Sequence, residues 1–335
     1  MCGRCHSNAE FMRDYNPSMR VDQVQRYATS VHGKLLAERN DPNVAVCESC
    51  HPAHQIKPPT DTESSVHPLN VAGTCGACHA DQEHMADYDI PVDQLDEYER
   101  SVHWTWMSEE GDLSAPTCND CHGNHGAAPP GVASVEIVCG QCHTFMADYF
   151  GGGPHGQYFI DADMPGCATC HGNHSIGATN DDMLLELNDT VCQRCHEQGE
   201  LGHDEFTLIR ALIDSLQAEV TTSREALEEA ELLGMEVSQA QFDLEEVTNA
   251  LVQARTAIHT FSVDSVQLQV DAGLAITATA HERAQNALGE HLFRRQGLAV
   301  SVVLILMVIA GIALLIRDIE RRNPPGAAPS TQHEP

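Results

Sequence analysis

The stretch Cys118-Asn119-Asp120-Cys121-His122 decides how this chain can fold, because its pattern occurs seven times. In each copy, two cysteines stand three positions apart and a histidine directly follows the second cysteine. The copies begin at Cys2, Cys47, Cys75, Cys118, Cys139, Cys167 and Cys192. Their second cysteines are Cys5, Cys50, Cys78, Cys121, Cys142, Cys170 and Cys195, and their histidines are His6, His51, His79, His122, His143, His171 and His196. These copies use all 14 cysteines of the 335-residue chain.

This spacing suits the covalent attachment of haem c. Two thiols three positions apart can add to the two vinyl groups of one haem, and the adjacent imidazole can then bind its iron as the proximal ligand. Zinc would need the cysteine pairs to associate in fours and would not require a histidine after every pair. Disulfides would not explain why a histidine directly follows the second cysteine in all seven motifs. The sequence therefore predicts seven covalently bound c-type haems, one for each motif.

The composition predicts that porphyrin faces supply the interior of the motif-bearing region. Residues 1–200 are rich in Gly, Pro, Asp and Asn, and aromatic residues make up only 5% of the chain. Such a segment has difficulty building a core from its own side chains. We therefore expect a mainly α fold with extensive loops and little sheet, which does not form without haem. The formal charge of −31 disfavours nucleic acid as a partner, since phosphate binding needs a basic surface.

The motifs fall into two types within a repeated unit. In the first type a second histidine follows the motif histidine by three positions, as at His54, His125 and His174. The second type lacks it. A lone histidine precedes each first-type motif, and these are His32, His103 and His155. The unit therefore consists of a lone histidine, a first-type motif and a second-type motif, and it runs three times. The motif at Cys2 is of the second type and no signal peptide precedes it, so we expect an N-terminally incomplete or processed chain.

The surplus histidines are the candidates for the distal iron ligands. A histidine three residues after a motif histidine lies on the proximal side of its own haem, so we expect His54, His125 and His174 to bind a neighbouring iron. The lone histidines His32, His103 and His155 are the other expected distal ligands. One iron then lacks a partner, and the remaining candidates are His67, His84, His203 and His259. We expect a helical hairpin to bring His203 and His259 near the last haem.

The composition changes to Ala, Leu, Glu, Gln and Val from Glu205 to about Leu292. Apolar residues recur there at helical spacing. One stripe consists of Leu208, Leu212, Leu216 and Val220, and another consists of Leu244, Val247, Leu251 and Ile258. Breaks at Gly234 and at residues 262–264 predict three long helices in an antiparallel bundle or coiled coil. This region is either a stalk that forms oligomers or a helical subdomain that covers the last haem.

The stretch Leu298–Ile316 predicts a membrane-spanning helix, because it is apolar, uncharged and about 28 Å long as a helix. Arginines flank it on both sides, so their count leaves the orientation open. Haem attachment requires export, which places the motifs outside the cytoplasm and the C-terminus inside. The expected domains are a haem domain over residues 1–200, a helical bundle over 201–296, a membrane helix over 297–316 and a disordered cytoplasmic tail over 317–335.

Several segments resemble a known group of multihaem cytochromes. They are Ser30 to Gly33, the Cys-His-Gly-Asn-His runs at Cys121–His125 and Cys170–His174, and the long C-terminal helices. They resemble proteins related to pentahaem nitrite reductase and octahaem hydroxylamine oxidoreductase, together with their electron-carrying relatives. Both catalytic signatures of those enzymes are absent. Every motif here ends in His where the reductase's catalytic haem motif ends in Lys, and no tyrosine follows Tyr158 for the oxidoreductase crosslink.

Two imidazoles on each iron leave no open position, so such haems carry electrons. The sequence therefore predicts a membrane-anchored electron-transfer protein on the extracytoplasmic side, rather than an enzyme. The expected partners are other redox proteins, either cytochromes or a membrane quinol-oxidising complex, and the helical region could form a homo-oligomer. The alternative is a multihaem reductase of a small nitrogen or sulfur compound, which would act at one haem with an open distal position.

Overall fold

The computed structural model describes residues 1–131, 135–184 and 191–322. This part of the chain contains helices and loops and no strands, as the sequence predicts. The chain divides into two compact units. The first, the motif unit, comprises Met1–Arg210 together with Thr256–Ser265, and the second, the bundle unit, comprises Ala211–Arg255 together with Val266–Pro335.

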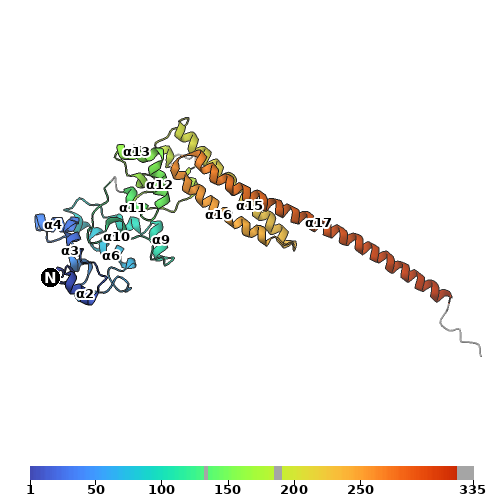
Figure 1. Ribbon diagram of the computed structural model, residues 1–335, viewed down its shortest axis with the longest axis horizontal. Helices are drawn as coiled ribbons and strands as arrows, with labels where there is room; N and C mark the ends of the chain where they lie inside the picture. The colour runs from blue at the N-terminus through green and yellow to red at the C-terminus, as the bar shows by residue number, and fades with distance from the viewer. Residues whose placement is uncertain (132–134, 185–190, 323–335) are drawn as a thin grey trace, which may run out of the picture. The chain divides into compact units, whose positions relative to one another are not determined.

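The motif unit is built from short helices, drawn from blue to green in Figure 1. Up to residue 122 these are α1 (Gly3–His6), α2 (Ala9–Tyr15), α3 (Gln23–Thr29), α4 (Val31–Arg39), α5 (Cys47–Cys50), α6 (Pro68–His79), α7 (Gln82–Met85), α8 (Gln94–Tyr98), α9 (Val102–Ser108) and α10 (Cys118–His122). They continue with α11 (Val135–Gly140), α12 (Thr144–Gly152), α13 (Pro154–Asp161), α14 (Gly166–His171) and the 3-10 turns η2 (Asp181–Leu184), η3 (Cys192–Arg194) and η4 (Ile258–Thr260).

Each attachment motif lies in or beside a helical turn. The backbone amide of the motif histidine donates to the carbonyl of the first cysteine, for example from His51 to Cys47 at 2.9 Å and from His196 to Cys192 at 3.0 Å. Residues three and four apart on a helical turn share one face. The turn therefore presents both thiols and the imidazole on the same side.

Glycines end two of these turns and redirect the chain. Gly123 and Gly172 directly follow the motif histidines His122 and His171, with φ of 78° and 77°. Side-chain-bearing residues rarely adopt this left-handed backbone, whereas glycine does so without a steric penalty. The chain therefore turns sharply after each of these motifs, before it reaches the next histidine of the Cys-His-Gly-Asn-His run.

The bundle unit is formed by most of α15 (Leu201–Leu232), α16 (Ser238–Ala257) and α17 (Val263–Arg322). The first residues of α15 and α17 and the last residues of α16 belong to the motif unit. The predicted breaks are confirmed, because Gly234 has a φ of 77° after α15 and α17 begins at Val263. Arg283 of α17 pairs with Asp243, near the start of α16. Gly273, which comes earlier in α17, lies against Ala250, which comes later in α16. These helices are thus antiparallel neighbours, as expected.

The buried face of α15 differs by one position from the predicted stripe. Ile213 and Leu216 are fully buried and Val220 is buried, whereas Leu208 is 50% exposed and Ile209 takes its place. The buried positions alternate in steps of three and four, which keeps one seam facing its neighbours. A stripe drawn with steps of four drifts off that seam, so the prediction was wrong for Leu208 and also for Leu212, which is half-buried beside the fully buried Ile213.

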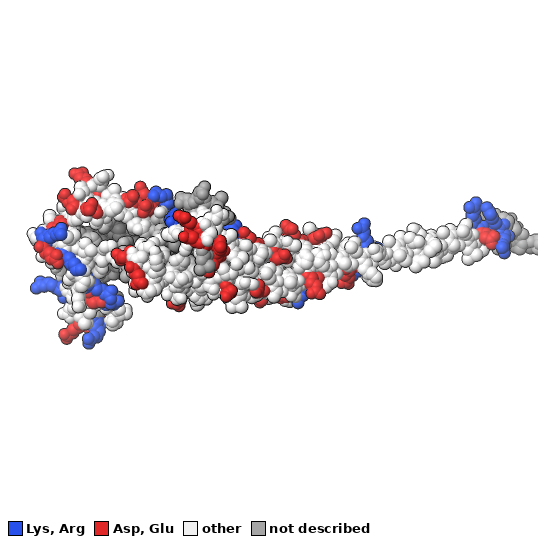
Figure 2. All heavy atoms as spheres, turned by 90° about the horizontal axis from the view of Figure 1, so that it is seen from above, with Lys and Arg blue, Asp and Glu red and all other residues white. Residues whose placement is uncertain are grey.

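The α17 helix contains a segment that is long and apolar enough to cross a membrane. Its most apolar 18-residue window has a mean hydropathy of 3.1, and none of that window is buried. Figure 2 shows this uncharged part of the helix between clusters of basic side chains. The helix continues to Arg322, so residues 317–322 are helical rather than part of a disordered tail. An (i, i+4) ion pair between Asp318 and Arg322 supports this last turn. The rest of the predicted tail lies outside the described residues.

Candidate functional site

The thiols of the motifs are arranged neither as cystines nor as metal clusters. All 14 cysteines are free and lie at exposed or half-buried positions. Within the described ranges, no three or more His, Cys, Asp or Glu side chains converge as they would around a metal ion. A tetrahedral zinc site needs four such ligands together. The geometry therefore does not fit zinc.

Six of the seven motif histidines face a second histidine. The paired rings and their centroid separations are His79 with His32 at 6.1 Å, His51 with His125 at 6.2 Å, His143 with His103 at 6.3 Å, His122 with His174 at 6.0 Å, His196 with His155 at 5.9 Å, and His171 with His259 at 6.1 Å. A metal–imidazole bond is about 2 Å long and the ring centroid lies about 1 Å behind the nitrogen, so two imidazoles on one metal have centroids about 6 Å apart. The six pairs therefore fit iron held between two imidazoles.

The pairs follow the repeat. Each lone histidine faces the second-type motif of its own unit, as His32 faces His79. Two of the three histidines that follow a first-type motif histidine by three positions face the first-type motif of the preceding unit, since His125 faces His51 and His174 faces His122. The last first-type motif has no following unit, and His259 from η4 takes that place. Sequence spacing alone predicted the two sets of histidines but not which motif each one faces.

The lone histidines are positioned by serine caps. Ser30 begins α4 and its Oγ accepts from the backbone amide of Gly33 at 2.9 Å. Ser101 begins α9 in the same way, with the amide of Trp104 at 3.1 Å. Both serines are only 1% exposed. A capped helix start fixes the direction in which the next turn presents its side chains, so the serines orient His32 and His103.

Backbone hydrogen bonds join two of the three lone histidine segments, those of His32 and His103, to the following unit. The amide of Val31 donates to the carbonyl of Ala127 at 3.0 Å, and the amide of Val102 donates to the carbonyl of Ile176 at 2.7 Å. Ala127 and Ile176 each lie two residues after the second histidine of a first-type motif, at His125 and His174. The same three-dimensional unit therefore occurs at least twice, which explains why the ring pairs repeat.

Burial favours the neutral form of the paired imidazoles. It lowers the pKa of His32, His103 and His155 below the usual value. It also lowers the pKa of His171, and the nearby His259 adds to that shift. Neutral imidazole is the form that binds a metal. The paired rings therefore stay in the metal-binding form to a lower pH than a free imidazole does.

The thiols of successive motifs lie next to one another. A hydrogen bond between Cys75 and Cys118 raises the pKa of the first thiol and lowers that of the second to about 7. Cys139 and Cys167 form an equivalent pair, which lowers the pKa of Cys139 to about 7. These two contacts connect the third motif to the fourth and the fifth to the sixth.

Electrostatic effects connect the remaining motifs in order. Burial and then the nearby His6 lower the pKa of His51, which relates the first motif to the second. Burial raises the pKa of Cys50, Cys121 and Cys170, with further contributions from Cys78, Cys139 and Cys195 in that order. The seven motifs therefore follow one another through the unit as a continuous row.

Three of the candidate ligands have other surroundings. His67 is 3% exposed and begins α6, where its Nδ1 accepts from the amide of Leu69 at 3.3 Å. His84 stacks on Tyr88 at 6.3 Å, and His203 lies edge-on to Phe206 at 4.9 Å. Within the described ranges, neither His67 nor His84 forms a ring pair with a motif histidine.

The loop between α16 and α17 contacts the ring pairs of two motifs. His259 faces His171 of the sixth motif, rather than the last motif as the sequence suggested. Phe261 lies 3.9 Å, centroid to centroid, from His155, whose partner His196 belongs to the last motif. The hairpin expected from the sequence therefore touches both ring pairs at the end of the row.

Residues 161–201, which contain the sixth and seventh motifs, match the family described as a doubled CXXCH motif. The match indicates a multihaem c-type cytochrome. It supports covalently bound haem c in this chain, and such a protein interacts with redox partners. The chain shows no significant match to a curated protein or to a solved structure.

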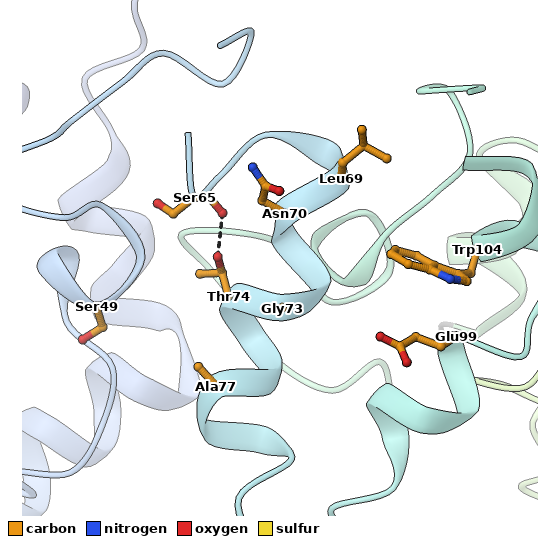
Figure 3. A pocket seen from close by; sticks show the side chains of 9 residues that line it. All are labelled: Ser49, Ser65, Leu69, Asn70, Gly73, Thr74, Ala77, Glu99 and Trp104. Atoms are coloured by element: carbon orange, nitrogen blue, oxygen red, sulfur yellow. Dashed lines mark hydrogen bonds between the residues drawn. The ribbon is translucent and has the colours of Figure 1, made fainter. Parts of the chain in front are cut away.

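A cavity of about 500 Å³ lies between two motifs of this chain (Figure 3). It is lined by Ser49 of the second motif and Ala77 of the third, together with Ser65, Leu69, Asn70, Gly73, Thr74, Glu99 and Trp104. A hydrogen bond of 2.6 Å from Thr74 to the Ser65 carbonyl braces one wall. Glu99 is the one ionisable side chain among these nine residues, so the cavity offers no acid–base pair.

Proposed function

We propose that this chain is a membrane-anchored electron-transfer protein that holds seven c-type haems, one on each motif. The observation that carries the proposal is the set of six imidazole pairs spaced at about 6 Å. Bound haem supplies one-electron chemistry at its iron. The paired histidines would hold that iron between them, and no position would then be left there for a substrate.

The protein's own residues keep these sites close together. Cys75 lies next to Cys118, and Cys139 lies next to Cys167, so successive attachment points are side by side. The second histidines His125 and His174 each lie three residues after the histidine of one motif and face the histidine of another. These links favour a continuous row along which electrons pass between redox partners.

We propose that α17 anchors the protein through residues 297–316, with the motifs on the extracytoplasmic side. Attachment of haem c takes place after export, which supports this orientation. The donor and acceptor are proposed to be other cytochromes or a quinol-oxidising membrane complex.

A second candidate function rests on His6. This is the one motif histidine without a ring partner among the described histidines, so its iron is where a small nitrogen or sulfur compound could bind. A redox titration followed by electron paramagnetic resonance and near-infrared magnetic circular dichroism tests both ideas. Electron transfer predicts six bis-imidazole irons that bind neither nitrite nor hydroxylamine. Turnover of either compound at the remaining iron would favour the reductase.

A further inference from the structure

Two imidazoles of the repeat are without ring partners in the described part of the chain, and both belong to the same end of the row. His6 is the motif histidine of the first motif, and His54 is the second histidine of the second motif. His54 is exposed, as are Cys2 and Cys5. The first and second motifs are neighbours, because His6 contributes to the lowered pKa of His51.

The repeat defines what each of these imidazoles would face. Second histidines face first-type motifs of the preceding unit, as His125 and His174 do. All three first-type motif histidines of this chain already have partners, since His171 faces His259. Second-type motif histidines, the class to which His6 belongs, face lone histidines. A His54–His6 pair would break both rules at once.

We propose that His54 is an axial ligand for a haem carried outside these 335 residues, on a segment with the same repeat, and that the lone histidine of that segment binds the iron at His6. The inference rests on the proposed function, because it needs haem in the motifs. At this end of the row, each segment would then supply an imidazole to an iron of the other segment. We call this contact the junction.

The backbone supports such a junction. In both copies that can be compared, the lone histidine segment is hydrogen-bonded to the residues two positions after a second histidine. By the same rule, the carbonyl of Ile56, two residues after His54, would be the acceptor for a further segment. Ile56 is 62% exposed and His54 is exposed as well, so this part of the chain is open to an incoming segment.

The test uses the full holoprotein in detergent and a short haem peptide with one Cys-x-x-Cys-His motif, whose iron keeps its sixth position open. We expect the wild-type protein to convert one equivalent of the peptide to the low-spin form. His54→Ala should weaken this binding at least tenfold, and the control His84→Ala should not. Equal binding by wild type and His54→Ala would overturn the proposal.

Spectroscopy of the protein alone gives an independent outcome. We expect six bis-imidazole irons in both wild type and His54→Ala, and one further iron that takes up a single equivalent of added imidazole. If the wild type has seven bis-imidazole irons and His54→Ala has six, His54 binds within the chain and the inference fails while the proposed function stands. A protein without covalent haem would instead refute the proposed function.

The source of the outside haem is read from haem-stained denaturing gels of protein extracted from its own membrane. A single polypeptide with more than seven haems places the segment in the same chain, and a second haem-stained band that dissociates from it places the segment in a partner. Seven haems in total, all with two imidazoles, would contradict the proposal.

Discussion

The motif unit and the bundle unit differ in what fills them. The bundle unit has a continuous apolar interior in which Ile213, Leu216, Val247, Val266 and Val270 are fully buried. In the motif unit the buried apolar side chains are scattered, and the fully buried positions include the cap serines Ser30 and Ser101.

The difference shows which groups stabilise the fold of each unit. Steps of three and four residues bury a seam along α15, so the bundle unit is stabilised by its own side chains. In the motif unit, thiols and imidazoles are the groups that the loops bring together. We infer that attached haem stabilises the motif unit and has little influence on the bundle unit.

The largest effect is expected when haem is withheld. Protein produced without haem attachment should lose the fold of the motif unit, because the cofactor supplies its folding free energy. The bundle unit should keep its helices. Limited proteolysis and far-ultraviolet circular dichroism check this, and a protease-resistant motif unit in haem-free protein would remove the contrast between the units.

The next effect concerns one pair in the row. His259→Ala removes the partner of His171 and should convert one iron of the set from low spin to high spin. His281→Ala, in the bundle part of α17, is the control and should leave the spectrum unchanged. Electron paramagnetic resonance of the ferric protein measures both variants, and identical spectra would show that His259 is no ligand.

A smaller effect is expected inside the bundle unit. A methyl group on Gly273 would lie 2.8 Å from a Leu216 methyl, so Gly273→Ala overpacks the interior and should cost about 1–3 kcal/mol of unfolding free energy. Gly289→Ala lies on the same helix in open space and should stabilise it by about 0.5–1 kcal/mol. Thermal unfolding followed at 222 nm compares them, while the haem absorbance should not change. Equal midpoints for the two variants would contradict this packing.

The smallest effect is expected at a helix cap of the motif unit. Ser101→Ala removes the hydroxyl that accepts from the amide of Trp104 and should cost about 1 kcal/mol. Because the cap orients His103, the change should also broaden the signal of one low-spin iron. The control Ser108→Ala, at the other end of α9, should leave that signal sharp. Broadening in both variants would mean that the cap does not position the imidazole.

The sequence was sufficient for the helices and their breaks. Gly234 follows the end of α15 and Ser262 directly precedes α17, as the pattern predicts, and the apolar segment of α17 is where its composition places it. The exact seam of α15 was not predictable from steps of four, because neighbouring helices select Ile209 over Leu208.

The imidazole pairs were predictable only in part. The spacing of His125 and His174 identifies them as candidates, yet the motif that each one faces depends on the left-handed turns at Gly123 and Gly172 and on long-range backbone hydrogen bonds. His259 lies far from its partner along the chain and outside the repeat, so only the fold connects it to His171. No local signal distinguishes it from His203 or His84.

The most direct test of the central claim is the intact mass of the purified chain, measured together with a pyridine haemochrome assay. Haem on every motif predicts a mass increase equal to seven haems, no free thiol, and the spectrum of haem bound through two thioethers. Unmodified thiols, cystines or bound zinc in place of that chromophore would contradict it.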